Sequence, residues 1–168
     1  VVEAFLDGPG DALWWVDSDM GFAPNALDML LESFDPIERP IVGGLCFALR
    51  ENELDGLGGY RCAPRVTIMD WVEHEGHQRF MGRTTYPENS VVQCAGTGSA
   101  FVLIARRVLE AIREEHGAVW YDRVRGTDGS LLGEDVSFCL RAGALGFPIF
   151  VDTRIKCGHV KIMFFSTA

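Results

Sequence analysis

Apolar residues along the chain follow two patterns. Short apolar runs predict strands, which we place at Ala12–Val16, Pro40–Leu49, Val91–Ala95 with its extension Phe101–Ile104, and Ile149–Lys156. Apolar residues at helical spacing predict helices, which we place at Val1–Leu6, from Pro24 to about Phe34, at Ala105–His116 and at Glu134–Leu145. This alternation is typical of an α/β domain. No internal repeat or linker divides the chain, so residues 1–168 are predicted to form a single domain.

Glycines and polar residues mark the predicted connections. Arg65–Glu73 and Gln78–Thr84 are expected to pair as a hairpin around the turn at residues 75–77. The glycines at 43 and 44 are expected to interrupt the strand that contains them. The polar, glycine-rich stretch Asn52–Gly59 is predicted to be a loop.

The composition is that of an ordinary globular protein with excess acid. The chain has 168 residues, of which 48% are hydrophobic and 23% charged, and its net charge is −9. Nucleic-acid binding requires clustered lysines and arginines, so this composition indicates no nucleic-acid-binding surface. It is compatible with an acidic pocket for a divalent cation. No apolar run approaches the roughly 20 residues of a transmembrane segment.

The cysteines favour neither disulfides nor structural zinc. They are odd in number and widely spaced, with no C-x-x-C pair, at positions Cys46, Cys62, Cys94, Cys139 and Cys157. We therefore expect reduced thiols and a cytoplasmic protein.

Asp17 and Asp19 stand at the end of the apolar run Ala12–Val16. Strands of an open α/β sheet present ligand-binding residues at their C-terminal ends. Two carboxylates one residue apart can converge on a cation where the backbone turns, and carboxylate oxygens suit Mg²⁺ or Mn²⁺. The pair is a candidate metal site, with a solvated loop or a helix N-cap as the alternative.

Glu134 and Asp135 begin a predicted amphipathic helix. Acidic residues at this position stabilise the positive end of the helix dipole, and that role would be sufficient to account for them. A carboxylate at the same place could instead accept the proton of an attacking hydroxyl, as a general base. The local sequence leaves both interpretations open.

His159 and the segment Gly96–Ser99 carry weaker signals. His159 follows the last predicted strand, and imidazole can supplement carboxylates around a manganese-type ion, although a lone histidine is more often structural. The glycines of Gly96–Ser99 would let the backbone approach a ligand closely. The segment lacks the lysine of a Walker loop and the third glycine of a dinucleotide fingerprint, so a tight turn is the alternative.

Taken in order, these pieces resemble the GT-A fold glycosyltransferases, especially bacterial and phage enzymes similar to glycosyltransferase family 2. Four blocks carry the resemblance: WWVDSDMGFAPNALDMLL, RPIVGGLCFALR, GTGSAFVLIARRVLEAI and GEDVSFCLRAGALGFPIFVDTRIKCGH. The first and last blocks are the specific ones. The resemblance implies a GT-A-like mixed sheet flanked by helices, Mn²⁺ or Mg²⁺ as cofactor, and a nucleotide-diphosphate sugar as donor.

The resemblance also implies the chemical roles. Asp17 and Asp19 would engage the metal and the donor diphosphate, with Asp19 as the more direct ligand, and His159 would complete the metal site. Asp135 would be the base of an inverting reaction. Glu134 would be the alternative base or an acceptor-binding group.

Binding roles follow in the same way. Gly96, Thr97 and Gly98 would line the donor-sugar pocket. Trp120 and Tyr121 would contact the acceptor, an assignment that rests on position alone. The acceptor class stays open among glycan, lipid, protein and modified nucleic acid.

The chain departs from the family pattern at its beginning. GT-A enzymes place a β-α-β unit that holds the nucleotide base before the D-x-D strand, whereas only 16 residues precede Asp17 here. The resemblance therefore implies a fold that lacks this unit. Two alternative functions remain: a nucleotidyltransferase, and a non-catalytic carbohydrate-binding or structural derivative of the fold.

Overall fold

The computed structural model describes residues 1–54, 60–127 and 129–160 and combines a seven-stranded sheet, a separate hairpin and four helices. The sheet strands are β1 (Ala12–Val16), β2 (Met20–Gly21), β3 (Ile41–Leu54), β4 (Tyr60–Val66), β7 (Val91–Cys94), β8 (Phe101–Ala105) and β9 (Ile149–His159). The hairpin strands are β5 (Met69–His74) and β6 (His77–Gly82). The helices are α1 (Val2–Leu6), α2 (Ala26–Ser33), α3 (Arg106–His116) and α4 (Glu134–Ala144).

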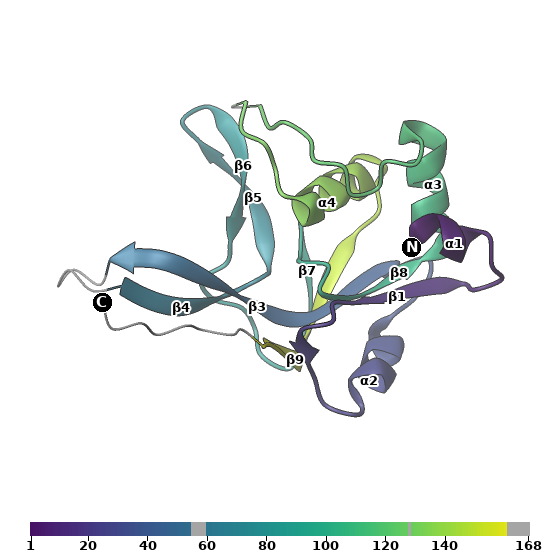
Figure 1. Ribbon diagram of the computed structural model, residues 1–168, viewed down its shortest axis with the longest axis horizontal. Helices are drawn as coiled ribbons and strands as arrows, with labels where there is room; N and C mark the ends of the chain where they lie inside the picture. The colour runs from purple at the N-terminus through teal and green to yellow at the C-terminus, as the bar shows by residue number, and fades with distance from the viewer. Residues whose placement is uncertain (55–59, 128, 161–168) are drawn as a thin grey trace, which may run out of the picture.

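The sheet is mixed and has helices on both faces. Its strand order is β1-β8-β3-β9-β2, with β4 paired to β3 and β7 paired to β9. The β3–β9 pair is parallel and the other pairs are antiparallel. Helices α3 and α4 lie on one face and α2 on the other (Figure 1). The predicted mixed sheet flanked by helices is therefore confirmed.

Strand β8 lies at the centre of this packing, and all five of its residues are buried. Side chains alternate between the two faces of a strand. Val102 and Ile104 therefore pack in the cluster that includes α3 and α4, while Phe101 and Leu103 pack in the cluster that includes α2. A strand that is covered on both faces has apolar residues at every position, as β8 does.

Three predicted connections were wrong. Strand β3 runs through Gly43 and Gly44 without a break. The segment Phe101–Ile104 does not extend the preceding strand, because β7 pairs with β9 whereas β8 pairs with β1 and β3. The first part of the predicted loop, residues 52–54, belongs to β3, and residues 55–59 lie outside the described residues.

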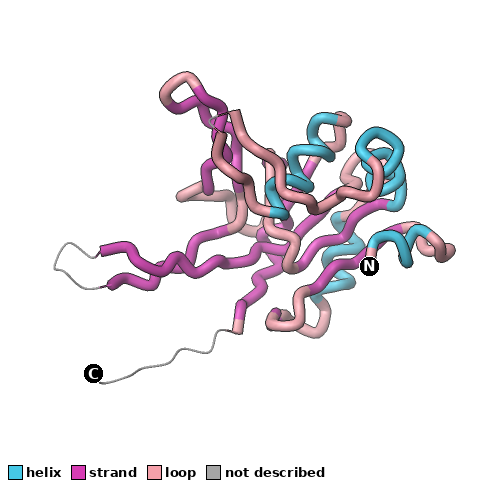
Figure 2. The backbone as a smooth tube through the Cα atoms, turned by 45° about the horizontal axis from the view of Figure 1, so that its top comes forward, coloured by secondary structure: helices cyan, strands magenta, loops and turns pink. Residues whose placement is uncertain are grey.

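The predicted hairpin is confirmed in its turn and corrected in its length. Strands β5 and β6 pair antiparallel, with His74 opposite His77. Glu75 and Gly76 both have positive φ, at 53° and 77°, as a tight two-residue hairpin turn requires. Arg65 and Val66 belong instead to β4, which pairs with β3, and β5 begins only at Met69. Figure 2 shows the β5–β6 hairpin rising away from the main sheet.

The irregularity in the sheet lies in β9. Gly44 pairs with Asp152 and the next residue, Leu45, pairs with Lys156, so residues 153–155 bulge out of register with β3. A side chain at position 44 would have no room, because a Cβ there would lie 2.9 Å from the ring of Phe101 and 3.1 Å from Cys157 Sγ. Gly44 is therefore needed for close packing at the bulge.

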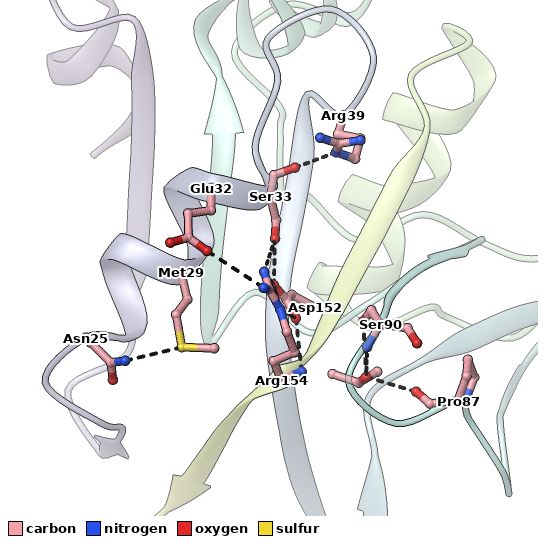
Figure 3. Close-up of polar contacts among 10 residues, drawn as sticks. Asn25, Met29, Glu32, Ser33, Arg39, Pro87, Ser90, Asp152 and Arg154 are labelled. Atoms are coloured by element: carbon pink, nitrogen blue, oxygen red, sulfur yellow. Dashed lines mark hydrogen bonds and ion pairs between the residues drawn. The ribbon is translucent and has the colours of Figure 1, made fainter.

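A buried carboxylate holds the bulge to α2 (Figure 3). Asp152 is fully buried, and its Oδ2 accepts hydrogen bonds from Ser33 Oγ at 2.6 Å and from Arg154 Nη2 at 2.7 Å. Its Oδ1 accepts from the Arg154 backbone N–H at 3.0 Å. Burial acts to raise the pKa of Asp152, but the hydrogen bonds from Arg154 and Ser33 outweigh burial and hold the pKa below its ordinary value.

The described helices and cysteines agree with the sequence in two further respects. Within the described residues, no helix is both long enough and apolar enough to cross a membrane. The cysteines whose side chains are described are free thiols, at positions Cys46, Cys94, Cys139 and Cys157.

Replacing Asp152 by Asn should destabilise the fold by about 2–4 kcal/mol, because the change removes a charged acceptor and leaves Arg154 beside a neutral amide. Urea unfolding measures the change in the free energy of unfolding. Asp11→Asn is the matched control, since Asp11 is exposed and should change stability by less than about 0.5 kcal/mol.

The same experiment has a pH signature. Because the folded pKa of Asp152 is depressed, its contribution is present at neutral pH and is lost as pH falls through the folded pKa, below about pH 4. The stability difference between wild type and Asp152→Asn should therefore shrink in acid. Equal stability of the two proteins at pH 7 would contradict this role.

Candidate active site

Asp17, Asp19 and His159 converge at one end of the sheet. One ligand atom from each lies within 4.8 Å of the others. Asp17 is exposed and the other two residues are half-buried. A group of two carboxylates and one imidazole, open on one side, has the donor types and spacing of a site for a hard or borderline divalent cation.

A turn after β1 sets the positions of the two aspartates. Met20 N–H donates to Asp17 O at 3.2 Å, and Asp17 N–H donates to Ala100 O at 3.0 Å, which ties the turn to the start of β8. Trp15 Nε1 donates to Asp17 Oδ1 at 3.2 Å and so orients that carboxylate. The structure thus turns the chain directly after the strand, as convergence of the two acids requires.

His159 reaches the aspartates through a short strand that sequence analysis missed. Strand β2 pairs with the end of β9, so that Met20 lies opposite His159, and Val160 N–H donates to Asp19 O at 2.8 Å. The Nδ1 atom of His159 lies 2.6 Å from Phe47 O. A carbonyl only accepts, so Nδ1 carries the proton, and the lone pair available to a cation is on Nε2.

Asp135 is half-buried at the first turn of α4. Burial raises the pKa of Asp135 above its ordinary value, and the neighbouring charges of Glu134 and Asp17 act in the same direction. Hydrogen bonds from Ser99, through its side chain and its backbone, oppose the shift without cancelling it. Glu134 is exposed beside it. A carboxylate with a raised pKa close to other acids is suited to proton transfer.

Gly96–Ser99 lies between the aspartates and α4 and is buried throughout. Thr97 N–H and Cys139 Sγ lie 3.5 Å apart, and the Cys139 thiol also donates to Thr97 O at 3.5 Å. A Cβ at position 98 would lie 3.4 Å from Thr67 and 3.7 Å from Asp135 Oδ2. The segment packs against α4 through its backbone, and a glycine at 98 leaves open the space beside Asp135.

Stacked aromatic rings connect the two groups of acids. Tyr121 stacks on Phe138 with ring centroids 4.8 Å apart and lies 5.1 Å from the ring of Trp15. Trp15 binds Asp17, and Phe138 lies one helical turn after Asp135 on α4. The stack therefore fixes the distance between the aspartates and the start of α4.

Trp120 and Tyr121 have different environments. Trp120 is only 6% exposed, and its Nε1 donates to Leu109 O at 2.8 Å, so its side chain belongs to the core and is not available to an acceptor. Tyr121 Oη is buried near Ser99 but makes no hydrogen bond of good geometry among the described residues. Burial raises the pKa of Tyr121, so its hydroxyl stays protonated and can donate.

A cavity of about 480 Å³ opens in front of Asp135. Its walls come from the start of α4, the β5–β6 hairpin and the end of β4, and include Thr67, Phe80, Gly98 and Glu134. This volume is in the range of small-molecule sites. The two carboxylates that begin α4 therefore face a space large enough for a substrate.

Several contributors to the site were not predicted. Ser99, Trp15 and the Phe47 carbonyl bind Asp135, Asp17 and His159 respectively. Trp15 had a sequence signal, because it stands in the strand just before the aspartates, and Ser99 ends the glycine segment already named as a candidate. The contacts of Ser99 with Asp135 and of the Phe47 carbonyl with His159 depend on strand pairing and packing.

Comparison with known proteins shows likeness in structure only. No protein-family model matches the chain, and no curated protein sequence matches it. The crystal structure of A197 from STIV matches with a TM-score of 0.55 at 19% identity, covering 96% of this chain and 64% of A197. The crystal structure of GalNAc-T7 with UDP, GalNAc and Mn²⁺ matches with a TM-score of 0.54 at 11% identity, covering 95% of this chain and 29% of GalNAc-T7. The TM-scores show a similar fold, and at these low identities the likeness is one of fold alone.

The raised pKa of Asp135 gives a direct test of the electrostatics. Carboxyl ¹³C NMR titration should place its pKa above the ordinary value for aspartate. Glu134→Gln should lower that pKa, because it removes a neighbouring negative charge, and Ser99→Ala should raise it, because it removes a donor to the carboxylate. Asp11→Asn is the control and should leave it unchanged. An Asp135 pKa at or below the ordinary value would show that the carboxylate is not desolvated.

Proposed function

We propose that the chain is a metal-dependent glycosyltransferase that moves a sugar from a nucleotide-diphosphate donor to an acceptor hydroxyl, with inversion at the anomeric carbon. The observation that carries this proposal is the convergence of Asp17, Asp19 and His159 within 4.8 Å, in a fold where Asp135 stands close enough to respond to the charge of Asp17. A candidate metal site and a candidate base are thus neighbours.

The donor set fits Mn²⁺ or Mg²⁺, with the imidazole favouring Mn²⁺. When bound, such an ion would neutralise charge on a leaving diphosphate as a Lewis acid. Asp19 and His159 Nε2 would hold it directly, and Asp17, fixed by Trp15, would assist. Three protein ligands leave coordination positions for diphosphate oxygens.

Asp135 would act on the acceptor. In the proposed reaction its carboxylate takes the proton of the acceptor hydroxyl as the new oxygen–carbon bond forms, and the electron pair of the broken bond leaves with the nucleoside diphosphate. A base is most effective when its pKa approaches the working pH, and burial moves the pKa of Asp135 in that direction. Ser99 would hold the carboxylate in place.

The fold likeness supports the class of reaction. GalNAc-T7, a GT-A glycosyltransferase, has been crystallised with UDP, GalNAc and Mn²⁺, and a protein with that fold can present a nucleotide sugar and a metal together. A fold alone does not define an activity. The proposal therefore depends on the acids and the histidine, and the donor base and sugar are left to experiment.

Metal-dependent nucleotide binding is the first expected property. In calorimetric titrations with UDP, GDP, ADP, CDP and dTDP, at least one should bind with Mn²⁺ and lose binding in EDTA. Asp19→Ala should weaken that binding at least about tenfold, because it removes a charged ligand. Asp11→Ala is the matched control. No binding of any nucleotide by the wild-type chain would contradict a working donor site.

Asp135 should be needed for sugar transfer but not for binding of the donor. Asp135→Asn should reduce transfer by about 10²–10⁴-fold while metal-dependent nucleotide affinity changes little. Product analysis then separates the reactions: a glycosyltransferase releases nucleoside diphosphate, whereas a nucleotidyltransferase releases pyrophosphate. Undiminished transfer by Asp135→Asn would remove this residue from the role of base.

A further inference from the structure

A second cavity adjoins the one in front of Asp135. It has a volume of about 460 Å³ and is called here the distal cavity, lined by residues of the hairpin, the 125–133 segment and α4 that include Trp71, Gln78, Arg79, Arg125, Thr127 and Leu140. Both cavities are bordered by Met69, Phe80, Gly133 and Val136. A ligand long enough to occupy both would therefore extend from the distal cavity to Asp135.

Hydrogen bonds fix the wall that carries Arg125. Arg125 pairs with Leu131 in an isolated bridge, and Leu132 N–H donates to Val124 O at 2.8 Å. The hydroxyl of Ser137 on α4 accepts from Val124 N–H at 3.1 Å and donates to Gly133 O at 2.8 Å. The segment is thus attached to the helix that begins with Glu134 and Asp135. These bonds hold the two cavities in a fixed position relative to each other.

Charge distinguishes the distal cavity from the rest of the molecule. The protein has a net charge of −9, yet the described residues that line this cavity include Arg79 and Arg125 and no carboxylate. The neighbouring cavity is lined by charges of both signs, Arg65 and Arg83 with Glu134 and Asp135, and the Arg83 guanidinium is paired with the Asp70 carboxylate at 2.5 Å. The positive charge of the distal cavity, with no described carboxylate in its lining, favours a ligand with an anionic group at that end.

The distal cavity also presents an aromatic surface. Trp71 is 43% exposed, and its ring lies against Phe80 with centroids 3.9 Å apart and planes tilted by 40°. Large aromatic side chains that stay exposed beside a cavity are typical of binding surfaces, because they offer apolar area that a ligand can cover. The indole edge and the arginines together suit a ligand that is part apolar face and part anion, as an acidic sugar is.

We propose that the distal cavity binds an acidic saccharide acceptor, with a sugar ring against Trp71 and a carboxylate, sulfate or phosphate substituent at Arg125 and Arg79. The inference rests on the proposed function, because it identifies the cavity in front of Asp135 as the place where the acceptor hydroxyl reacts. The two cavities together require an acceptor of at least two sugar residues: one presents its hydroxyl to Asp135, and the other carries the anion.

The test is a binding experiment without metal or nucleotide. Matched disaccharides that end in glucose, galactose or mannose are titrated in EDTA and followed by NMR at the Trp71 indole N–H. In each set, C6 of the terminal ring is a free hydroxymethyl group, a carboxylate, or an O6 sulfate or phosphate ester. At least one acidic member should bind about five- to twentyfold more tightly than its neutral partner. A higher salt concentration should reduce this preference for the acidic disaccharide, because salt screens its attraction to the arginines. The carboxylate, sulfate and phosphate arms identify the anion.

Variants separate the contributions of charge and stacking. Arg125→Gln should abolish the preference for the acidic member while the neutral disaccharide binds as before, and Arg125→Lys should retain part of it. Trp71→Ala should weaken both. Arg113→Gln, an exposed arginine on α3 outside the cavity lining, is the matched control and should have no effect.

Three results would overturn the proposal: equal affinity for acidic and neutral partners, no binding by any acidic member, or sodium sulfate or phosphate alone binding as tightly as the acidic disaccharide. Failure of the transferase proposal is measured separately, as absence of Mn²⁺-dependent nucleotide binding. An Arg125-dependent preference without nucleotide binding would support the acidic-saccharide cavity and reject the transfer reaction.

Discussion

Strand β9 changes its neighbours along its length, and the candidate site depends on where it does so. Residues 149–152 pair with β3 and β7, and residues 153–155 leave register with β3. Residues 156–157 pair with β3 again, and residues 158–159 pair with β2 beside Asp19. The change occurs at Asp152, a buried carboxylate whose desolvation is offset by Arg154 and Ser33. Because an unpaired buried charge is costly, this network favours one path for β9, and that path delivers His159 to the aspartates.

The candidate metal ligands and the candidate base share one scaffold. The segment Gly96–Ser99 contacts α4 through Cys139 and is followed by Ala100, whose carbonyl accepts from Asp17. Ser99 binds Asp135, and the ring of Tyr121 lies between Trp15 and Phe138. Because these residues are in close contact, the position of the candidate metal ligands relative to the candidate base is set by the core rather than by a surface loop.

The candidate metal site, the start of α4 and the distal cavity carry different charges. Asp17 and Asp19 stand with His159, and Glu134 and Asp135 begin α4, where burial and then the charges of Glu134 and Asp17 raise the pKa of Asp135. The arginines of the distal cavity lie beyond them, next to exposed Trp71. A197 and GalNAc-T7 have a similar fold at 19% and 11% identity. The side chains that line the two cavities, and not the fold, would therefore encode specificity.

The sequence by itself determined the parts that depend on local patterns: the buried strand ending in Asp17 and Asp19, the amphipathic helix that begins with two acids, and the turn of the β5–β6 hairpin. Only the tertiary structure decided that β2 pairs with the end of β9, that β7 and β8 are separate strands, and that Trp120 is buried in the core while the hydroxyl of its neighbour Tyr121 lies near Ser99. Local spacing sets which face of an element is apolar, but strand pairing and burial join residues from opposite ends of the chain, and no local pattern specifies those partners.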